Sequence, residues 1–137
     1  MKLVKEILYE KFTSDSDPIK DLGIGIKHKI EEWIKYIRQH HGTYTITDYV
    51  INDDMSIDAS KVDISFNEID HLPNYIKFNN IERSFSCCFN DIETIRKHGP
   101  KNVGENYKIY HTKPISFTEK DIKKICNVNG FIRINAV

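Results

Sequence analysis

Two octets in the middle of the chain share one pattern of residue types, and this repeat limits the possible folds more than any other feature. Residues 62–69 have the sequence VDISFNEI and residues 85–92 have the sequence FSCCFNDI, so position 62 corresponds to position 85 and position 69 to position 92. A third, weaker copy begins at Tyr107, the counterpart of Phe85, with Thr112 in the place of the asparagine. One copy cannot bury its own apolar face, so such repeats predict successive coils that stack into a solenoid. The alternative is chance similarity between two β segments of a chain rich in Ile and Asn.

The order of residue types within the octet predicts how each coil is built. Its first and third residues are apolar, with one residue between them, a pattern typical of a short strand with one buried face. Cys87 is therefore expected to point inward and Cys88 outward. The asparagine at the sixth position, Asn67 or Asn90, is expected to turn the backbone, with its amide bonding peptide groups that would otherwise lack a partner.

The octets resemble the L-x-L-x-x-N-x-L core of leucine-rich repeats. Residues 67–73, NEIDHLP, are also similar to the N-x-L-x-x-L-P turn of the short bacterial type of these repeats. In the second copy, Ile95 and Arg96 stand where that turn has Leu-Pro. The resemblance therefore implies a leucine-rich-repeat-like fold, with an irregular rather than a uniform coil.

Two longer stretches resemble proteins of large bacteriophages of gut bacteria. Residues 72–131 are similar to small leucine-rich-repeat-like phage proteins, in which an L-P-x-x-I segment, F-x-C strands and a terminal helix with C-x-V-x-G occur together; that last motif is residues 126–130 here. Residues 6–25 resemble a leader found on otherwise different phage proteins. The resemblance implies a phage origin, and hence a location in the cytoplasm of the host cell or in the virion.

Helices are predicted on both sides of the repeat. Apolar residues at helical spacing predict a short helix within residues 1–12 and a second helix that ends before Gly42. One face of this second helix carries Ile26, Ile30, Trp33, Ile34 and Ile37. Near the other end of the chain, Thr118 followed by Asp121 is a capping pattern for a helix near residues 118–126, and residues 131–134 alternate as a final strand.

We therefore predict an α+β protein in which N-terminal amphipathic helices cap a short, irregular leucine-rich-repeat-like β solenoid, followed by a C-terminal helix and a final strand. Residues 1–22 are the leader with its short helix, residues 23–42 the capping helix and residues 43–137 the β-rich domain, with residues 23–137 folding as one unit. Capping is expected because a stack of few coils exposes apolar ends and unpaired strand edges.

The charge balance and hydropathy exclude two classes of partner. The chain has 137 residues, with 20 basic and 20 acidic side chains and a formal net charge of zero. A nucleic-acid binder or a protein of anionic membrane surfaces would carry a basic excess, so we expect neither partner. No apolar stretch approaches the roughly 20 residues that span a bilayer. Three cysteines, two of them adjacent, indicate reduced thiols of an intracellular protein rather than a disulfide framework.

The histidines, cysteines and acidic residues do not form a recognisable catalytic or metal-binding motif. The six histidines include no H-x-x-x-H pair, and no C-x-x-C accompanies them. We therefore expect no catalytic residues, no metal and no cofactor. A weaker alternative is a small enzyme that uses a His/Cys or His/Asp pair; His98 or His111 within hydrogen-bond reach of Cys88, in a concave pocket, would support it.

A surface therefore carries the predicted function. We expect a non-catalytic protein-binding accessory module, encoded by a phage and acting on a host or phage protein. An alternative is a structural component of the virion or of a compartment, directed there by the leader. The sequence leaves the partner and the oligomeric state open. The predicted protein-binding face consists of the outward residues of the strands: Asp63, Ser65, Ser86, Cys88, Lys108 and Tyr110.

Overall fold

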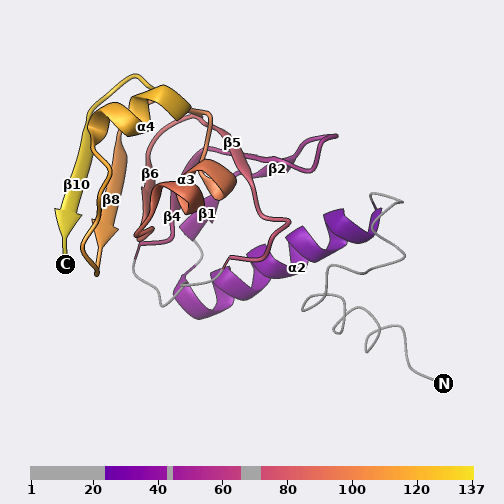
Figure 1. Ribbon diagram of the computed structural model, residues 1–137. Coiled ribbons are helices and arrows are strands. Elements are labelled where there is room, and N and C mark those ends of the chain that lie inside the picture. The colour runs from indigo at the N-terminus through magenta and orange to yellow at the C-terminus, as the bar shows by residue number, and fades with distance from the viewer. Residues whose placement is uncertain (1–23, 43–44, 66–71) are drawn as a thin grey trace.

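In the part of the chain that the structure describes, two five-stranded sheets form the framework of this mixed α/β protein (Figure 1). The computed structural model describes residues 24–42, 45–65 and 72–137, and it places three helices among them. The elements follow in the order α2 (Ile24–His41), β1 (Ile46–Thr47), β2 (Val50–Ile51), β3 (Ile57–Ala59), β4 (Lys61–Asp63), β5 (Phe78–Ile81), β6 (Phe85–Cys87), α3 (Ile92–His98), β7 (Asn102–Val103), β8 (Tyr107–His111), α4 (Glu119–Ile125), β9 (Asn127–Val128) and β10 (Ile132–Ala136).

Both sheets are mixed, and the chain passes from one to the other. Sheet A has the strand order β1-β4-β6-β8-β10, and sheet B has the order β2-β3-β5-β7-β9. The β1–β4 and β2–β3 pairs are antiparallel, and all other pairs are parallel. From β5 onward, the chain therefore lays one strand in sheet B, turns a corner, and lays the next strand in sheet A.

The register of sheet A follows the alignment of the sequence repeat. Val62 lies opposite Phe85, and Phe85 lies opposite Tyr107, so the first residues of the three copies are paired in space. A further strand continues the series, because Tyr107 lies opposite Ile132. The predicted pairing of these positions is confirmed, whereas Asn67, the counterpart of Asn90, lies outside the described residues.

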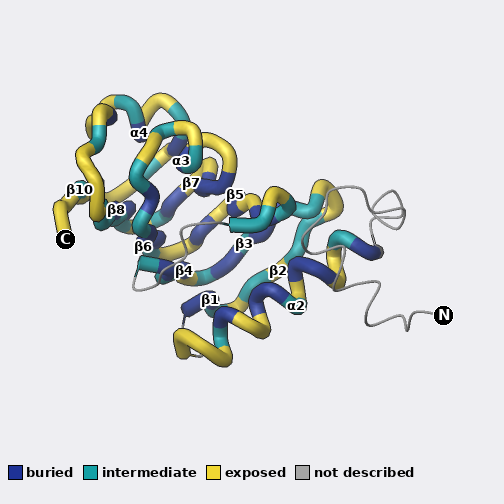
Figure 2. The backbone as a smooth tube through the Cα atoms, turned by 60° about the horizontal axis from the view of Figure 1, so that its bottom comes forward, coloured by how far each residue is buried: buried dark blue, intermediate teal, exposed yellow. Residues whose placement is uncertain are grey.

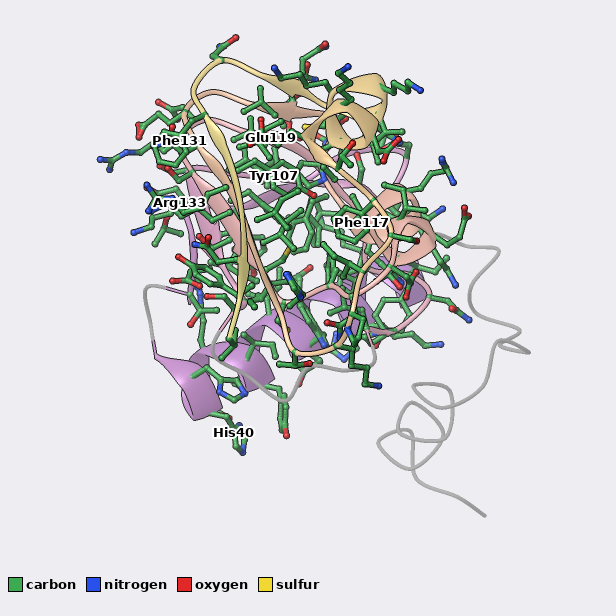
Figure 3. The ribbon with its side chains drawn as sticks, turned by 60° about the vertical axis from the view of Figure 1, so that its left-hand side comes forward. His40, Tyr107, Phe117, Glu119, Phe131 and Arg133 are labelled. Atoms are coloured by element: carbon green, nitrogen blue, oxygen red, sulfur yellow. The ribbon has the colours of Figure 1, made fainter. Side chains whose placement is uncertain are left out.

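Alternation along the strands of sheet A directs every second side chain into the core. Phe85, Cys87 and Tyr107 are fully buried, which confirms the inward position predicted for Cys87 (Figure 2). Figure 3 shows Tyr107 among the interior side chains. The ring of Phe85 lies edge-to-face between those of Phe78 and Tyr107, with centroids 5.3 and 5.2 Å away. Aromatic pairs at this distance and angle add to the stabilisation that comes from burial alone.

Helix α2 lies beside β1, at the end of sheet A that is opposite β10 (Figure 2). The predicted helix over residues 23–42 is confirmed within one residue at each end. Its apolar face is buried as expected, with Ile30, Trp33, Ile34 and Ile37 in the core. The Arg38 side chain donates to the carbonyl of Ile46 at 3.0 Å and so ties the helix to β1. The leader, residues 1–22, lies outside the described residues.

The corners between the two sheets stack directly on one another, and this stacking explains two glycines. Gly104 donates its N–H to the carbonyl of Ile81 at 2.8 Å, in the preceding corner. A Cβ atom on Gly104 would overlap the carbonyl oxygen of Glu82, and one on Gly130 would overlap that of Glu105. Only glycine allows the backbones to approach this closely.

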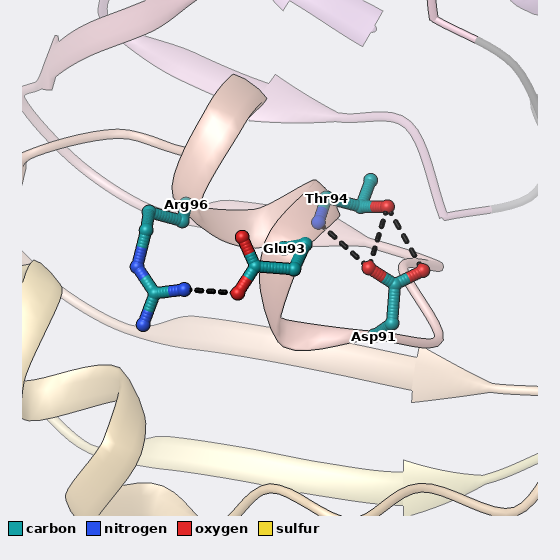
Figure 4. Close-up of polar contacts among 4 residues, drawn as sticks. All are labelled: Asp91, Glu93, Thr94 and Arg96. Carbon is teal, nitrogen blue, oxygen red and sulfur yellow. Dashed lines mark hydrogen bonds and ion pairs between the residues drawn. The ribbon is translucent and has the colours of Figure 1, made fainter.

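Two short helices lie side by side on the same edge of the molecule (Figure 1). Helix α4 confirms the helix predicted near residues 118–126, and Asp121 accepts from the N–H of Thr118 at 2.8 Å. The final strand predicted over residues 131–134 is confirmed as β10. Helix α3 was not predicted. Its N-cap, Asp91, accepts from the backbone N–H of Thr94 at 2.8 Å and from the Thr94 hydroxyl (Figure 4).

Candidate protein-binding face

Four parallel strands of sheet A bring part of the predicted face into one row. Asp63 lies opposite Ser86, and Ser86 lies opposite Lys108. The row continues to Arg133 on β10, which lies opposite Lys108. Neighbouring strands are about 4.8 Å apart, so the row is about 14 Å long. We call the outward side of these strands the sheet A face.

The other predicted residues lie one step further along the strands. Tyr110 lies opposite Asn135 of β10. Ser65 and Cys88 lie just beyond the ends of β4 and β6, and the Cys88 thiol donates to the carbonyl of Ile64 at 3.7 Å. Asp63 accepts from both the N–H of Ser65 at 3.1 Å and its hydroxyl at 2.6 Å. These contacts hold the carboxylate of Asp63 against Ser65.

Burial separates the side chains that a partner could touch from those that it could not. Ser86 is only 7% exposed, so its hydroxyl offers little contact area. Lys108 and Tyr110 are half-buried, and Arg133 is exposed. The guanidinium of Arg133 lies 4.8 Å from the ring centre of Phe131, and Figure 3 shows both residues at the surface. The face thus carries a carboxylate at the β4 end and two cations with an aromatic ring at the β8–β10 end.

Arg133 and Asn135 were not among the predicted face residues. The signal that could have found them is the alternation of Ile132 and Ile134 with these two polar residues. The step in the sequence from Tyr107 to Ile132 is also close to the period of the repeat. The final strand was predicted, but its membership of the same sheet follows only from the register with β8.

The outer side of sheet B carries a ladder of asparagines, which the sequence analysis did not predict. Asn102 donates to the side-chain oxygen of Asn80 at 2.6 Å, and Asn127 donates to that of Asn102 at 3.0 Å. The backbone N–H of Asn80 donates in turn to the carboxylate of Asp58 at 3.0 Å. Each of these asparagines is followed by Ile or Val, and the recurrence of this dipeptide was the available signal.

The ladder forms one wall of an open groove of about 390 Å³. The lining carries three carboxylates, and neither an imidazole nor a thiol is among the described residues that line it. Its amides already bond to one another along the ladder. The groove residues are Asp48, Asp58, Ala59, Ser60, Asn80, Ile81, Glu82, Asn102, Val103, Gly104, Asn127 and Asn129.

The thiols and imidazoles singled out from the sequence lie in apolar or backbone-bonded positions. Burial raises the pKa of the Cys87 thiol, and it raises the pKa of Cys126 to about 12, so both remain protonated at neutral pH. A protonated thiol is a poor nucleophile. The His98 ring lies 2.6 Å from the carbonyl of Ile76 through Nδ1, and the His111 ring lies 2.9 Å from the carbonyl of Lys113.

Within residues 24–42, 45–65 and 72–137, no three or more His, Cys, Asp or Glu side chains are grouped so that they could hold a metal ion. No helix in those same ranges combines the length and the apolar character that crossing a bilayer requires.

Comparisons with known proteins give no relative from which a function could be transferred. No protein-family model, no characterised protein and no solved structure matches this chain. The function is therefore inferred from the side chains that the two sheets present.

Proposed function

We propose that this protein is a non-catalytic protein-binding accessory module, built as a short leucine-rich-repeat-like β solenoid that binds its partner through the sheet A face. The observation that carries the proposal is the single row of Asp63, Ser86, Lys108 and Arg133 across four parallel strands. The solenoid is supported by the parallel register of successive copies, a relationship that recurs in sheet B between Asn80, Asn102 and Asn127.

The shape of this face suits a macromolecule. The outward side of solenoid strands is broad and shallow, whereas small-molecule sites are clefts that bury most of the ligand. A stable protein interface buries about 800 Å² on each partner, and aromatic and Arg side chains contribute much of its energy. Tyr110 on β8 and Arg133 on β10 supply such side chains, and Lys108 on β8 lies opposite Arg133.

The opposite charges at the two ends of the row give the partner an orientation. Lys108 and Arg133 form a cationic end, and Asp63 forms an anionic end two strands from Lys108. Charges placed in this way accelerate encounter and disfavour the reversed orientation, although each adds little affinity at a solvated rim. A partner with an acidic group facing β8 and β10 fits best.

The resemblance of residues 72–131 to phage proteins supports a phage-encoded accessory role. The partner is then a host protein or another phage protein, met in the cytoplasm of the host or in the virion. The alternative role as a virion component depends on residues 1–22, which lie outside the described residues.

Capture experiments with two matched double variants test the proposal. The tagged wild type, Lys108→Ala/Tyr110→Ala and the control Lys123→Ala/Lys124→Ala are incubated with lysates of phage-infected gut bacteria. Lys123 and Lys124 are exposed on α4 and do not belong to the sheet A face. Mass spectrometry is expected to find a protein retained by the wild type and the control but lost from the Lys108/Tyr110 variant. Retention of every partner by that variant, at an unchanged melting temperature, would overturn the proposal.

A further inference from the structure

Strand β10 forms one edge of sheet A, and its backbone has an open side. In the described part of the chain, β8 is its only neighbour in the sheet, and Figure 1 shows β10 as the outermost strand there. Tyr107 donates its N–H to the carbonyl of Phe131 at 3.0 Å, and Val137 donates its N–H to the carbonyl of His111 at 2.9 Å. Residues 131, 133, 135 and 137 therefore direct their peptide groups toward β8. Because strand peptide groups alternate in direction, those of Ile132, Ile134 and Ala136 point to the open side.

This edge has few of the features that protect sheet edges from pairing. Natural edges carry proline, lysine, bulges or very short strands. The sequence of β10 is IRINA, it has five residues, and its pairing with β8 is continuous over all five. Its one charge, on Arg133, belongs to the outward row of the sheet A face. The open peptide groups thus form a regular template for another strand.

The sequence around Ile134 is complementary to itself when two copies run antiparallel. With Ile134 opposite Ile134, Ile132 lies opposite Ala136, and these are the residues whose peptide groups point outward. Antiparallel strands bond at every second opposed pair, so all three outward residues of each copy fall on bonding positions. A symmetric contact of this kind closes after two copies.

The side chains also match in this register. Arg133 lies opposite Asn135, so no like charges meet. Phe131 lies opposite Val137, and both are exposed apolar side chains. Pairing would bring both into contact at each end of the interface. Cross-strand apolar pairs stabilise antiparallel strands.

We propose that two copies of this chain associate through their β10 edges, antiparallel and with the two-fold axis at Ile134, to form one continuous sheet of ten strands. A second copy fits this edge because the antiparallel alignment about Ile134 pairs the open peptide groups, keeps like charges apart and brings exposed apolar side chains into contact. The association uses backbone groups and leaves the outward side chains of β4, β6 and β8 free, so it goes beyond the proposed binding function.

Light scattering of the eluting protein, over a range of concentrations, tests the association. The wild type is expected to approach twice the mass of 16.1 kDa as its concentration rises to the millimolar range. Ile134→Pro removes an N–H on the open side and leaves those that face β8, and proline is tolerated on edge strands in such positions. This variant is expected to remain at the monomer mass with an unchanged circular dichroism spectrum. A wild type that stays monomeric, or a folded Ile134→Pro variant that still dimerises, would overturn the proposal.

Disulfide cross-linking between introduced cysteines tests the proposed register directly. It also tests the association if the proline variant does not fold. Directly opposed, non-bonded antiparallel residues have Cα atoms about 4.5 Å apart, which a disulfide can bridge. In a Cys88→Ser background, Arg133→Cys/Asn135→Cys is expected to give a covalent dimer on oxidation, whereas Arg133→Cys alone is expected to give none. Cross-linking by Arg133→Cys alone, or failure of the double variant to cross-link, would reject this register and the association with it.

Discussion

Asn90 accepts a hydrogen bond from the backbone N–H of Thr112, in the next copy of the repeat, at 3.0 Å. From the sequence, this asparagine is expected to bond a peptide group that would otherwise lack a partner. Thr112 is the residue that replaces the asparagine in its own copy, so the donor and the acceptor stand at equivalent positions. One side chain thus links two neighbouring copies of the pattern.

Removing this link is expected to lower stability moderately. Asn90→Ala leaves the N–H of Thr112 without its acceptor, which costs about 1 kcal/mol of unfolding free energy. Urea denaturation followed by circular dichroism measures the change. Asn90→Asp keeps an acceptor oxygen at the same position and is expected to retain most of the wild-type stability. Equal losses in both variants would show that the hydrogen bond has no special role.

The N-cap of α3 offers a comparison within one helix (Figure 4). Asp91→Ala removes the acceptor for the Thr94 N–H and hydroxyl, and N-cap losses of this kind cost about 1 kcal/mol. Glu93→Gln weakens an exposed ion pair with Arg96 and removes no cap hydrogen bond, and such exposed pairs contribute less than about 1 kcal/mol. Thermal unfolding of both variants should therefore show a clear loss for Asp91→Ala alone. A larger loss for Glu93→Gln would contradict this assignment.

Because the corners are stacked, alanine substitutions at the adjacent residues Gly104 and Glu105 are expected to lower stability by very different amounts. A methyl group at Gly104 would overlap the carbonyl oxygen of Glu82, so Gly104→Ala should force the corners apart and cost more than about 2 kcal/mol. Glu105→Ala, at the same corner, removes an exposed side chain that pairs with Arg83 at 3.7 Å and should change stability by less than about 0.5 kcal/mol. Denaturant midpoints of the two variants test the difference. A tolerated Gly104→Ala would mean that the corners are not in contact.

The thiols are expected to differ sharply in accessibility. Cys87 is fully buried, Cys126 is 4% exposed, and burial raises the pKa of both. Cys88 is half-buried, just beyond the end of β6. Titration with Ellman's reagent should therefore modify one thiol of the native protein and all three after denaturation. In Cys88→Ser, no thiol of the native protein should react; rapid native reaction of Cys87 or Cys126 would contradict the inward assignment.

Sheet A could be predicted from the sequence because equivalent residues of its strands recur at a nearly constant spacing. Within each strand, inward and outward side chains also alternate. Val62, Phe85 and Tyr107 mark equivalent positions, and an error of one residue would turn the apolar side chains outward. The strands of sheet B from β7 onward have only two residues each, which is too short for alternation to show. The asparagine ladder joins residues from successive copies of the repeat, so its contacts become visible only once the register is known.

Helix α3 was missed because its apolar residues fit two patterns. Ile92 and Ile95 continue the offset of the repeat, and they are also three apart, as in one face of a helix. The helix forms because Asp91 caps its N-terminus by accepting a hydrogen bond from the N–H of Thr94. The alignment of the repeats contains no information about this cap. Arg133 was missed for another reason: its place beside Lys108 depends on the pairing of two strands between which the chain forms α4 and β9.

His98 is expected to make stability depend on pH. Its ring is buried, with Nδ1 2.6 Å from the carbonyl of Ile76. Burial lowers its pKa below the ordinary 6.5 by more than the hydrogen bond to Ile76 raises it, and the nearby Lys97 and Lys77 also lower it. Below pH 6.5, the unfolded chain therefore takes up a proton at this position before the folded protein does. The unfolding free energy should fall as the pH decreases from 6.5, until the pH reaches the lowered pKa of the folded state.

His98→Asn separates this titration from packing. The Asn side-chain N–H can donate to the carbonyl of Ile76 in place of Nδ1, but it has no proton to gain in this range. At about pH 8 the imidazole is neutral in both states, so the difference between the two proteins measures packing alone. Urea denaturation in steps toward acid should then show a smaller loss of stability for His98→Asn than for the wild type. If the unfolding free energies of the two proteins fell equally toward acid, other groups would cause the acid sensitivity. The buried imidazole would then take up its proton equally well in the folded and the unfolded state.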